Sequence, residues 1–347
     1  MLLEGMHLPL TTPFHADGRL NTRKLEDNVA RYAKTPAAGL VALGWSGQPT
    51  LLSDVETREA LAAVAGACVP EKVLIGGVSR DSVSSTLDLI EYAAVHEYDA
   101  ALVRVPSFLA DGDTAELLGY FQAVADRSAL PLILDGERMS EEAIVALARQ
   151  QAGKILGVVE RGTDSARVAR LVKASSEFKY DVTVTMVFAA TTGRMLARSK
   201  AAEAQLVSPA GLSGGSAVSV APAAGLKTVK TRTKTVGFQI LAGRTAGVLA
   251  ALEAGAVGAL PALAASAPQA CYEVLAAWKD GDPALAAEKQ ERVRALALRV
   301  EEELGVAGLK YGCDLTGYFG GRPRLPGLPL SGVEREEVER LMMGIRN

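Results

Sequence analysis

Residues 154–164 read KILGVVERGTD, an apolar run that stops abruptly at Glu160 and Arg161. A short run rich in Val and Ile is typical of a strand that is buried on both faces of a parallel sheet. In a parallel barrel, the end of such a strand lies at the rim where catalytic side chains gather. The last inward residue expected here is Val159, which has no reactive group. The stretch therefore predicts a fold and leaves the chemistry open.

Similar runs recur along the chain and alternate with longer segments of helical periodicity. The eight runs are MHLPLT (6–11), GLVALGW (39–45), KVLIGGVS (72–79), AALVRV (100–105), LPLILD (130–135), KILGVVE (154–160), FQILAG (238–243) and VGALPAL (257–263). In the segments between them, apolar residues recur three and four positions apart, and Ser53, Thr114 and Ser140 stand where helix N-caps are expected. This alternation predicts the α/β class and a (β/α)8 TIM barrel, a fold of about 250 residues.

One part of the chain interrupts the alternation. Between the sixth helix (about 164–177) and the seventh strand, residues 181–236 hold a β-branched run, DVTVTMVF, a helix candidate, RMLARSKAAEAQL, and a Gly/Ser/Ala/Pro-rich stretch. We expect an insertion of unknown fold on the N-terminal face of the barrel, as a peripheral flap or oligomer contact, or else reaching a neighbouring active site. The predicted organisation is a TIM barrel over residues 1–265 and a C-terminal helical extension over 266–347.

Composition and charge favour a small-molecule partner. The formal net charge of the 347 residues is −3, aromatic residues make up 5%, and the only basic cluster is KTVKTRTK at 227–234. We therefore expect no nucleic-acid and no membrane partner. Because the start MLLEGMHLPLTTPF lacks a basic region followed by an apolar helix, we expect a cytoplasmic protein.

The spacing of cysteines and histidines predicts neither a disulfide framework nor a metal site. Three cysteines lie far apart with no CxxC pair, and the three histidines fall at no ligand spacing. We predict no metal and no cofactor from these residues.

Five stretches resemble the dihydrodipicolinate synthase and N-acetylneuraminate lyase family of class I aldolases. They are LPLTTPFHADGRLN (8–21), GLVALGWSGQPTLLSDVETRE (39–59), AALVRVPSF (100–108), LAGRTAGVLAALEAGAVGAL (241–260) and LKYGCDLTGYFGGRPRLPGLPLS (309–331). The resemblance covers nearly the whole chain except residues 181–236. It implies a class I aldolase-like barrel, a lyase activity and a homo-oligomer, either a dimer or a tetramer.

The same resemblance puts the family's chemistry in question. Family members form a Schiff base between the carbonyl of pyruvate and a lysine on strand six, in a segment of the type GIKEASGD. With Gly157 and Glu160 aligned, that lysine position falls on Val159, and valine cannot form an imine.

Other family positions are also changed. The proton-relaying tyrosine of strand five falls on Asp135, and Arg138 stands near the position of an arginine that holds the substrate carboxylate. The Thr-Thr pair after strand two becomes Trp45 and Ser46, and the second tyrosine of the PYY segment becomes Phe108. Asp135 and Ser46 are thus the predicted catalytic residues. The predicted substrate-binding residues are Trp45, Gly47, Phe108, Arg138, Val159 and Arg244.

Two local alternatives stay open at the predicted rim. Asp135 and Glu160 end adjacent strands and could hold a divalent cation, although strand alternation favours an outward Glu160. Arg244 could clamp a substrate carboxylate or pair with Glu160 or Asp135.

The sequence supports two hypotheses of function. The first is a dihydrodipicolinate synthase-like lyase that acts on a 2-keto acid or sugar-acid derivative without a Schiff base. The second is a catalytically silent family member, a pseudoenzyme, that binds a small carboxylate metabolite or serves as an assembly or partner protein.

Overall fold

The eight apolar runs form one closed parallel barrel in the computed structural model, which describes residues 1–109, 114–162, 164–206 and 229–345. Around the barrel the strands follow the order β1-β10-β9-β6-β5-β4-β3-β2. Their bounds are β1 Gly5–Pro9, β2 Gly39–Ala42, β3 Val73–Gly77, β4 Ala100–Val103, β5 Leu132–Asp135, β6 Ile155–Glu160, β9 Gln239–Ala242 and β10 Gly258–Ala259. The predicted (β/α)8 TIM barrel is confirmed.

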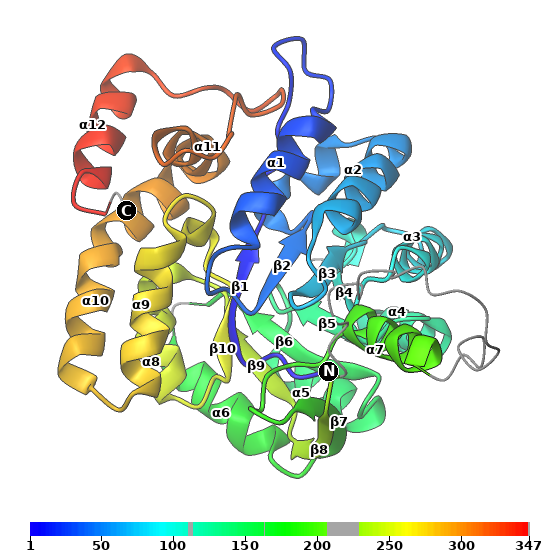
Figure 1. The fold of residues 1–347 in the computed structure, drawn as a ribbon. Helices are drawn as coiled ribbons and strands as arrows, with labels where there is room; N and C mark the ends of the chain where they lie inside the picture. Colours follow the sequence, from blue (N-terminus) through cyan, green and yellow to red (C-terminus); the bar gives the residue numbers. More distant parts are fainter. Residues whose placement is uncertain (110–113, 163, 207–228, 346–347) are drawn as a thin grey trace, which may run out of the picture.

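The helices lie outside the barrel, as Figure 1 shows. Those that follow the strands are α1 Thr22–Tyr32, α2 Asp54–Ala67, α3 Val83–Val95, α4 Thr114–Arg127, α5 Glu141–Gln150, α6 Ser165–Ser175 and α8 Val248–Glu253. The C-terminal helices are α9 Pro268–Lys279, α10 Pro283–Leu296, α11 Gly305–Leu315 and α12 Gly332–Met342, with a π-helical segment, η7 Ala297–Glu303, between α10 and α11. Ser53 and Ser140 cap α2 and α5 through their side chains, as predicted.

Strand alternation divides the apolar side chains into two cores. Leu134 and Val158 point outward into the large core beneath the helices, whereas Ile133 and Val159 point inward. The inward cluster is Leu3, Val41, Val73, Ile75, Ala100, Leu102, Ile133, Leu156, Val159, Leu241 and Leu260. The barrel is thus filled with side chains, and ligands can enter only at its ends.

The described part of the insertion is a two-stranded antiparallel sheet and a helix. β7 (Tyr180–Thr185) pairs with β8 (Thr231–Val236), and α7 (Gly193–Leu206) follows β7. The predicted helix at 194–206 is confirmed. β8 was not predicted, because TRTKTV exposes its polar residues and buries only Val236, so it has no apolar run. The Gly/Ser/Ala/Pro-rich stretch at 208–225 lies outside the described residues.

The insertion lies on the N-terminal face of the barrel, beside the N-terminus in Figure 1, as predicted. Val182, Val184 and Val236 pack on Leu2. Asp99, at the N-terminal end of β4, accepts hydrogen bonds from the backbone N–H groups of Leu74 (2.9 Å) and Gly193 (3.0 Å). Its carboxylate also lies 3.2 Å from the Arg194 guanidinium, in an ion pair whose side chains are 2% and 7% exposed. This ion pair joins the insertion to the N-terminal face of the barrel.

Loss of Arg194 should destabilise the whole fold. In R194M the Asp99 carboxylate stays buried without its cation, so we expect the free energy of unfolding to fall by about 3 kcal/mol or more. Urea unfolding followed by circular dichroism measures this change. The matched control is R198M on the exposed side of the same helix; equal unfolding midpoints for the two variants would contradict this role.

His7 should make the barrel sensitive to acid. It is fully buried in β1, with Nε2 3.0 Å from the Leu3 carbonyl oxygen, and burial lowers its pKa from 6.5 to about 4. The unfolded chain therefore binds this proton near pH 6.5, whereas the folded chain binds it only near pH 4. Stability is lost as the pH falls through this window, by about 2 kcal/mol at pH 5.

The variant H7Q keeps a hydrogen-bond donor and cannot titrate. We expect it to lack this part of the pH dependence when unfolding free energies at pH 7 and pH 5 are compared with those of the unaltered chain. An identical pH dependence in both proteins would show that His7 is not the titrating group.

Candidate functional site

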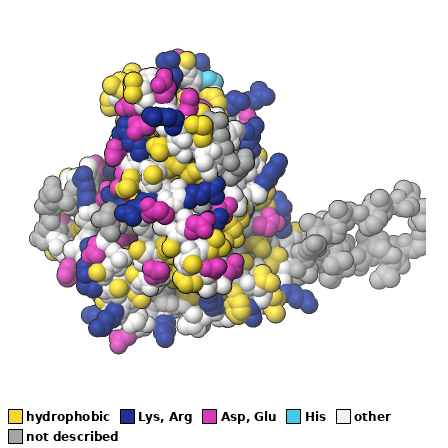
Figure 2. All heavy atoms as spheres, turned by 90° about the vertical axis from the view of Figure 1, so that its left-hand side faces the viewer, with side chains coloured by type: hydrophobic (Ala, Val, Ile, Leu, Met, Phe, Trp, Pro, Cys, Tyr) yellow, Lys and Arg dark blue, Asp and Glu magenta, His cyan; other side chains and the backbone are white. Residues whose placement is uncertain are grey.

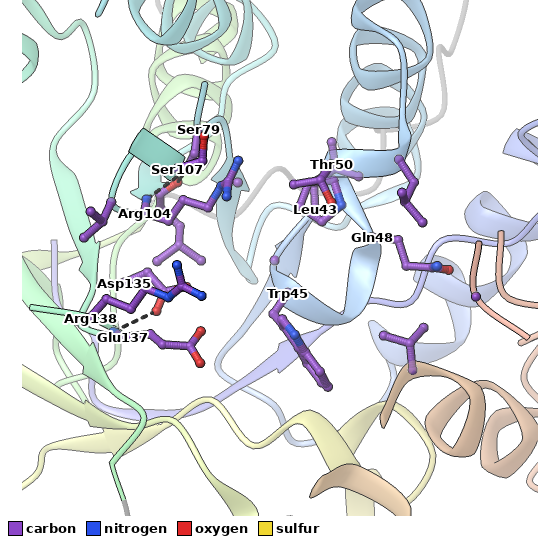
Figure 3. Close-up of a pocket in the computed structure, with 18 of the residues that line it drawn as sticks. Leu43, Trp45, Gln48, Thr50, Ser79, Arg104, Ser107, Asp135, Glu137 and Arg138 are labelled. Carbon is purple, nitrogen blue, oxygen red and sulfur yellow. Dashed lines mark hydrogen bonds between the residues drawn. The ribbon is translucent and has the colours of Figure 1, made fainter. Parts of the chain in front are cut away.

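A pocket of about 510 Å³ opens at the C-terminal end of the barrel (Figure 3). Most of its wall comes from the residues where strands β2 to β5 end, because alternation turns every second side chain toward the mouth. The lining polar side chains are Gln48, Thr50, Ser79, Arg104, Ser107, Asp135, Glu137 and Arg138, and Trp45 forms the facing wall. This is the end of the barrel where TIM-barrel enzymes carry their active sites.

Asp135 is the carboxyl group set deepest in this pocket wall. It is the next inward residue of β5 after Ile133, and its Cα is paired in register with that of Val159 on β6. Oδ1 accepts a hydrogen bond from the Glu137 backbone N–H (3.3 Å). Burial raises the pKa of Asp135 above its usual value, although the nearby Arg161 and Arg104 act in the opposite direction. Such a carboxyl can exchange protons closer to neutral pH than an ordinary aspartate.

Two arginines of the same wall have free guanidinium groups. Arg104 is fixed through its backbone N–H, which donates to Ser79 Oγ (2.8 Å), and Arg138 has a left-handed backbone with φ of 67°. Figure 3 shows the Arg138 side chain extending past Asp135 toward Trp45. Neither guanidinium makes a hydrogen bond or ion pair with a residue that the structure describes. Both are available for an anionic ligand.

Val159 and Arg161 are the last inward residues of the strand-six segment. Val159 is 2% exposed and packs in the barrel interior. Arg161 continues over the mouth, 5.0 Å from the Trp45 ring centroid and 3.9 Å from Glu137 Oε2. A Cβ on Gly243 would lie 2.7 Å from Arg161 Cγ, so a glycine at 243 is what lets this side chain pass.

Glu160 faces away from the pocket. Its carboxylate binds the Arg167 guanidinium of α6 (2.8 Å) and the Gly162 backbone N–H (2.7 Å). Asp135 and Glu160 therefore lie on opposite sides of the barrel wall and do not converge on a shared cation. In the described ranges, no group of three His, Cys, Asp or Glu residues is arranged to hold a metal ion.

Ser46 and Gly47 were predicted at the site but lie behind the described pocket wall. Ser46 is buried and its hydroxyl donates to the Leu10 carbonyl (3.3 Å). Gly47 accepts a hydrogen bond from Thr12 Oγ1 (2.6 Å). The contacts observed for both residues are hydrogen bonds within the protein. A catalytic role of Ser46 and a binding role of Gly47 stay predictions.

Phe108 and Arg244 also lie apart from the pocket. Phe108 is 67% exposed. Arg244 pairs with Glu302 (3.3 Å) and donates to the Arg161 carbonyl, so the alternative in which it pairs with Glu160 or Asp135 is wrong. The actual partner lies on η7, a segment that the sequence pattern did not place at the barrel mouth. A role of Arg244 in binding a carboxylate stays a prediction.

The C-terminal segments complete the mouth, and sequence reasoning missed them. Pro326 and Gly327 line the pocket, and Arg324 holds this tail by two bonds to the Glu56 carboxylate of α2 (2.6 and 2.8 Å). The Arg324 guanidinium holds the pKa of Glu56 down at about 2. The RPRLPG string in the sequence was the available signal, because a rigid Pro-rich tail that carries two arginines, Arg322 and Arg324, suggests a docked segment.

A buried glutamate on η7 supports the opposite side of the mouth. Glu301 accepts hydrogen bonds from the backbone N–H groups of Thr245 (3.2 Å) and Leu263 (2.9 Å), and from the Thr245 hydroxyl. Burial raises its pKa. It joins the loops after β9 and β10, and no local sequence pattern distinguishes it from its neighbours Glu302 and Glu303.

The surface carries no extended field of one charge on the face shown in Figure 2, where cationic and anionic side chains are interspersed. Within the described residues, no helix has the length and apolar character needed to span a membrane.

Comparisons with known proteins agree with this architecture. The model of the dihydrodipicolinate synthetase family matches residues 2–180 and 216–344. A 4-hydroxy-tetrahydrodipicolinate synthase of Acidiphilium cryptum is 27% identical over 99% of both chains. An L-threo-3-deoxy-hexylosonate aldolase of Hypocrea jecorina is 30% identical over 49% of this chain and 58% of its own.

Solved structures show the same fold. A putative dihydrodipicolinate synthetase from Pseudomonas aeruginosa superimposes with a TM-score of 0.77 at 20% identity, over 99% of this chain and 100% of its own. A dihydrodipicolinate synthase from Acinetobacter baumannii, complexed with pyruvate, gives 0.76 at 20% identity over 99% of both chains. Because the family model matches residues 2–180 and 216–344, which is most of its length, the chain belongs to the dihydrodipicolinate synthetase family.

Proposed function

We propose that the protein is a lyase of this family that acts on a 2-keto acid or sugar-acid derivative by acid–base chemistry without an imine. The relatives support this substrate class, since one is named as an aldolase of a deoxy-hexylosonate and another was solved with pyruvate. The single observation that carries the mechanism is a carboxyl of raised pKa, Asp135, beside two arginines that have no described partner.

Charge complementarity gives the two guanidinium groups, of Arg104 and Arg138, different roles in binding the substrate. One guanidinium, of Arg104 or Arg138, pairs with the substrate carboxylate in the bidentate geometry that suits carboxylates. The other lies near the carbonyl oxygen, where its positive charge stabilises developing negative charge. Trp45 closes the facing side of the pocket and limits the access of water.

Asp135 carries the proton in this proposal. Its carboxylate removes a proton from the carbon next to the substrate carbonyl, and the electron pair of the broken C–H bond forms an enolate whose oxygen faces a guanidinium. In the reverse direction, protonated Asp135 returns the proton to carbon and the carbonyl re-forms. A raised pKa suits this exchange, because it brings the protonated state of Asp135 closer to neutral pH than in an ordinary aspartate.

The absence of an imine can be tested directly. The amine that would attack pyruvate has no counterpart at Val159, so treatment with pyruvate and sodium borohydride should leave the protein mass unchanged. Intact-protein mass spectrometry measures this, with an authentic Schiff-base aldolase as positive control. A mass increase corresponding to reduced pyruvate would disprove the proposal, and peptide mapping would then identify the lysine.

Proton exchange tests the role of Asp135 without knowledge of the full substrate. In D2O the protein should speed the exchange of the pyruvate methyl protons, followed by NMR, and D135N should slow this exchange by about 10² or more. Pyruvate binding, measured by calorimetry, should persist in D135N because the arginines are unchanged.

The matched control is E137Q, which alters the neighbouring carboxylate on the same loop and should retain most of the exchange rate. If the unaltered chain binds pyruvate but catalyses no exchange of these protons or those of other 2-keto acids, the silent carboxylate binder is the better description. We also propose that the chain assembles as a homo-oligomer, as the family resemblance implies.

A further inference from the structure

A second cavity, of about 680 Å³, lies at the opposite end of the barrel from the candidate active site. Its wall combines the start of β1, the loop at residues 36–38, the segment at 255–257, one side of α9, and the turn at residues 187–190 of the insertion. That turn falls outside the two ranges that match the family model. The cavity is therefore built in part by a segment that the family match does not include.

Aromatic and apolar side chains dominate this wall. Phe188, Tyr272 and Trp278 contribute rings, and Val187 and Leu275 contribute aliphatic surface. Val187, Phe188 and Trp278 are 83%, 49% and 36% exposed, so large apolar groups face solvent here. A concave apolar site of this size is in the range of small-molecule pockets.

Phe188 is held in a conformation that a bulky residue seldom adopts. Its φ is 61°, in the left-handed region. The turn is closed by a hydrogen bond from its N–H to the Thr185 carbonyl (3.0 Å), and the Arg232 guanidinium lies 3.1 Å from its ring centroid. Asparagine or glycine would adopt this left-handed backbone conformation at a lower cost in folding free energy. Phenylalanine at this position therefore lowers the stability of the fold and places an aromatic ring in the cavity wall.

Charges at the rim are balanced. Glu4 is paired with Lys234, whereas Glu71 and Lys279 contribute one charge of each sign. Arg232 adds a cation against the Phe188 ring, but it does not line the cavity and donates to the Met186 carbonyl. The lining itself therefore gives no net preference for an anion or a cation. The Tyr272 hydroxyl and the Trp278 indole N–H make no hydrogen bond with the described residues, which leaves polar groups for a ligand with a single hydrogen-bonding function.

We propose that this cavity is a binding site for an uncharged, ring-bearing small molecule, separate from the carboxylate pocket. Aromatic walls supply apolar and ring contacts, and burying a net charge against these apolar walls without a partner of opposite charge is costly. The proposal stands independently of the proposed lyase activity, since the two cavities lie at opposite ends of a filled barrel and share no lining residue.

The chain's two tryptophans allow each cavity to be observed alone. Trp45 lines the carboxylate pocket and Trp278 the second cavity. In W45F, the uncharged probe N-phenyl-1-naphthylamine should quench Trp278 emission by energy transfer and saturate at one site per chain. In W278F, the quenching of Trp45 should be much weaker. Saturating pyruvate should not displace the probe.

Three further measurements distinguish binding in this cavity from non-specific binding of the probe to apolar surface. The anionic counterpart of the probe, 8-anilino-1-naphthalenesulfonate, should bind at least tenfold more weakly. F188N in the W45F background should weaken probe binding about tenfold while the melting temperature stays equal or rises. V95N, which removes an exposed apolar side chain from the distant helix α3, should leave binding unchanged.

Several results would overturn the proposal. These are equal binding of the neutral and anionic probes, equal quenching in W45F and W278F, and unchanged binding in F188N. Trp278 emission that changes with protein concentration in the absence of probe would also overturn it, because it would identify the cavity as a contact between two copies of the chain.

Discussion

Closure of the parallel barrel requires each strand to send alternate side chains inward, and the rest of the site depends on this constraint. The inward positions are filled with aliphatic groups until the strands end. Beyond that level the same alternation aims Asp135 and Arg161 over the mouth and turns Glu160 toward α6. The identity of the residue at each inward position thus decides the chemistry, while the backbone stays that of the family.

Val159 and the residues around it fit together at the mouth of the barrel. A valine completes the apolar filling next to Asp135, and the cation at the mouth is supplied one inward position later by Arg161. This side chain requires Gly243, directly after β9, and lies against Trp45. The site is therefore a coherent arrangement of arginines and a buried carboxyl.

Sequence patterns predicted the elements whose signals are local. The eight strands are apolar runs, and Ser53 and Ser140 mark helix starts by side-chain chemistry, so both could be located without the structure. β8 was missed because its alternating threonines and cations form no apolar period. The ion-pair partner of Arg244 was not among the candidates that the sequence offered, because Glu302 is 58 positions away and is brought near by the path of η7. Long-range contacts of this kind leave no trace in a single sequence.

The bond between Arg324 and Glu56 joins residues from the two ends of the chain to make one pocket wall. During synthesis, all eight barrel strands leave the ribosome well before residues 324–327. A nascent chain can thus close its barrel and fill the barrel interior, whose last residue is Leu260, while its mouth is still unfinished. The pocket wall is completed after the barrel interior, so a chain that ends before residue 324 would have a filled barrel without the finished site.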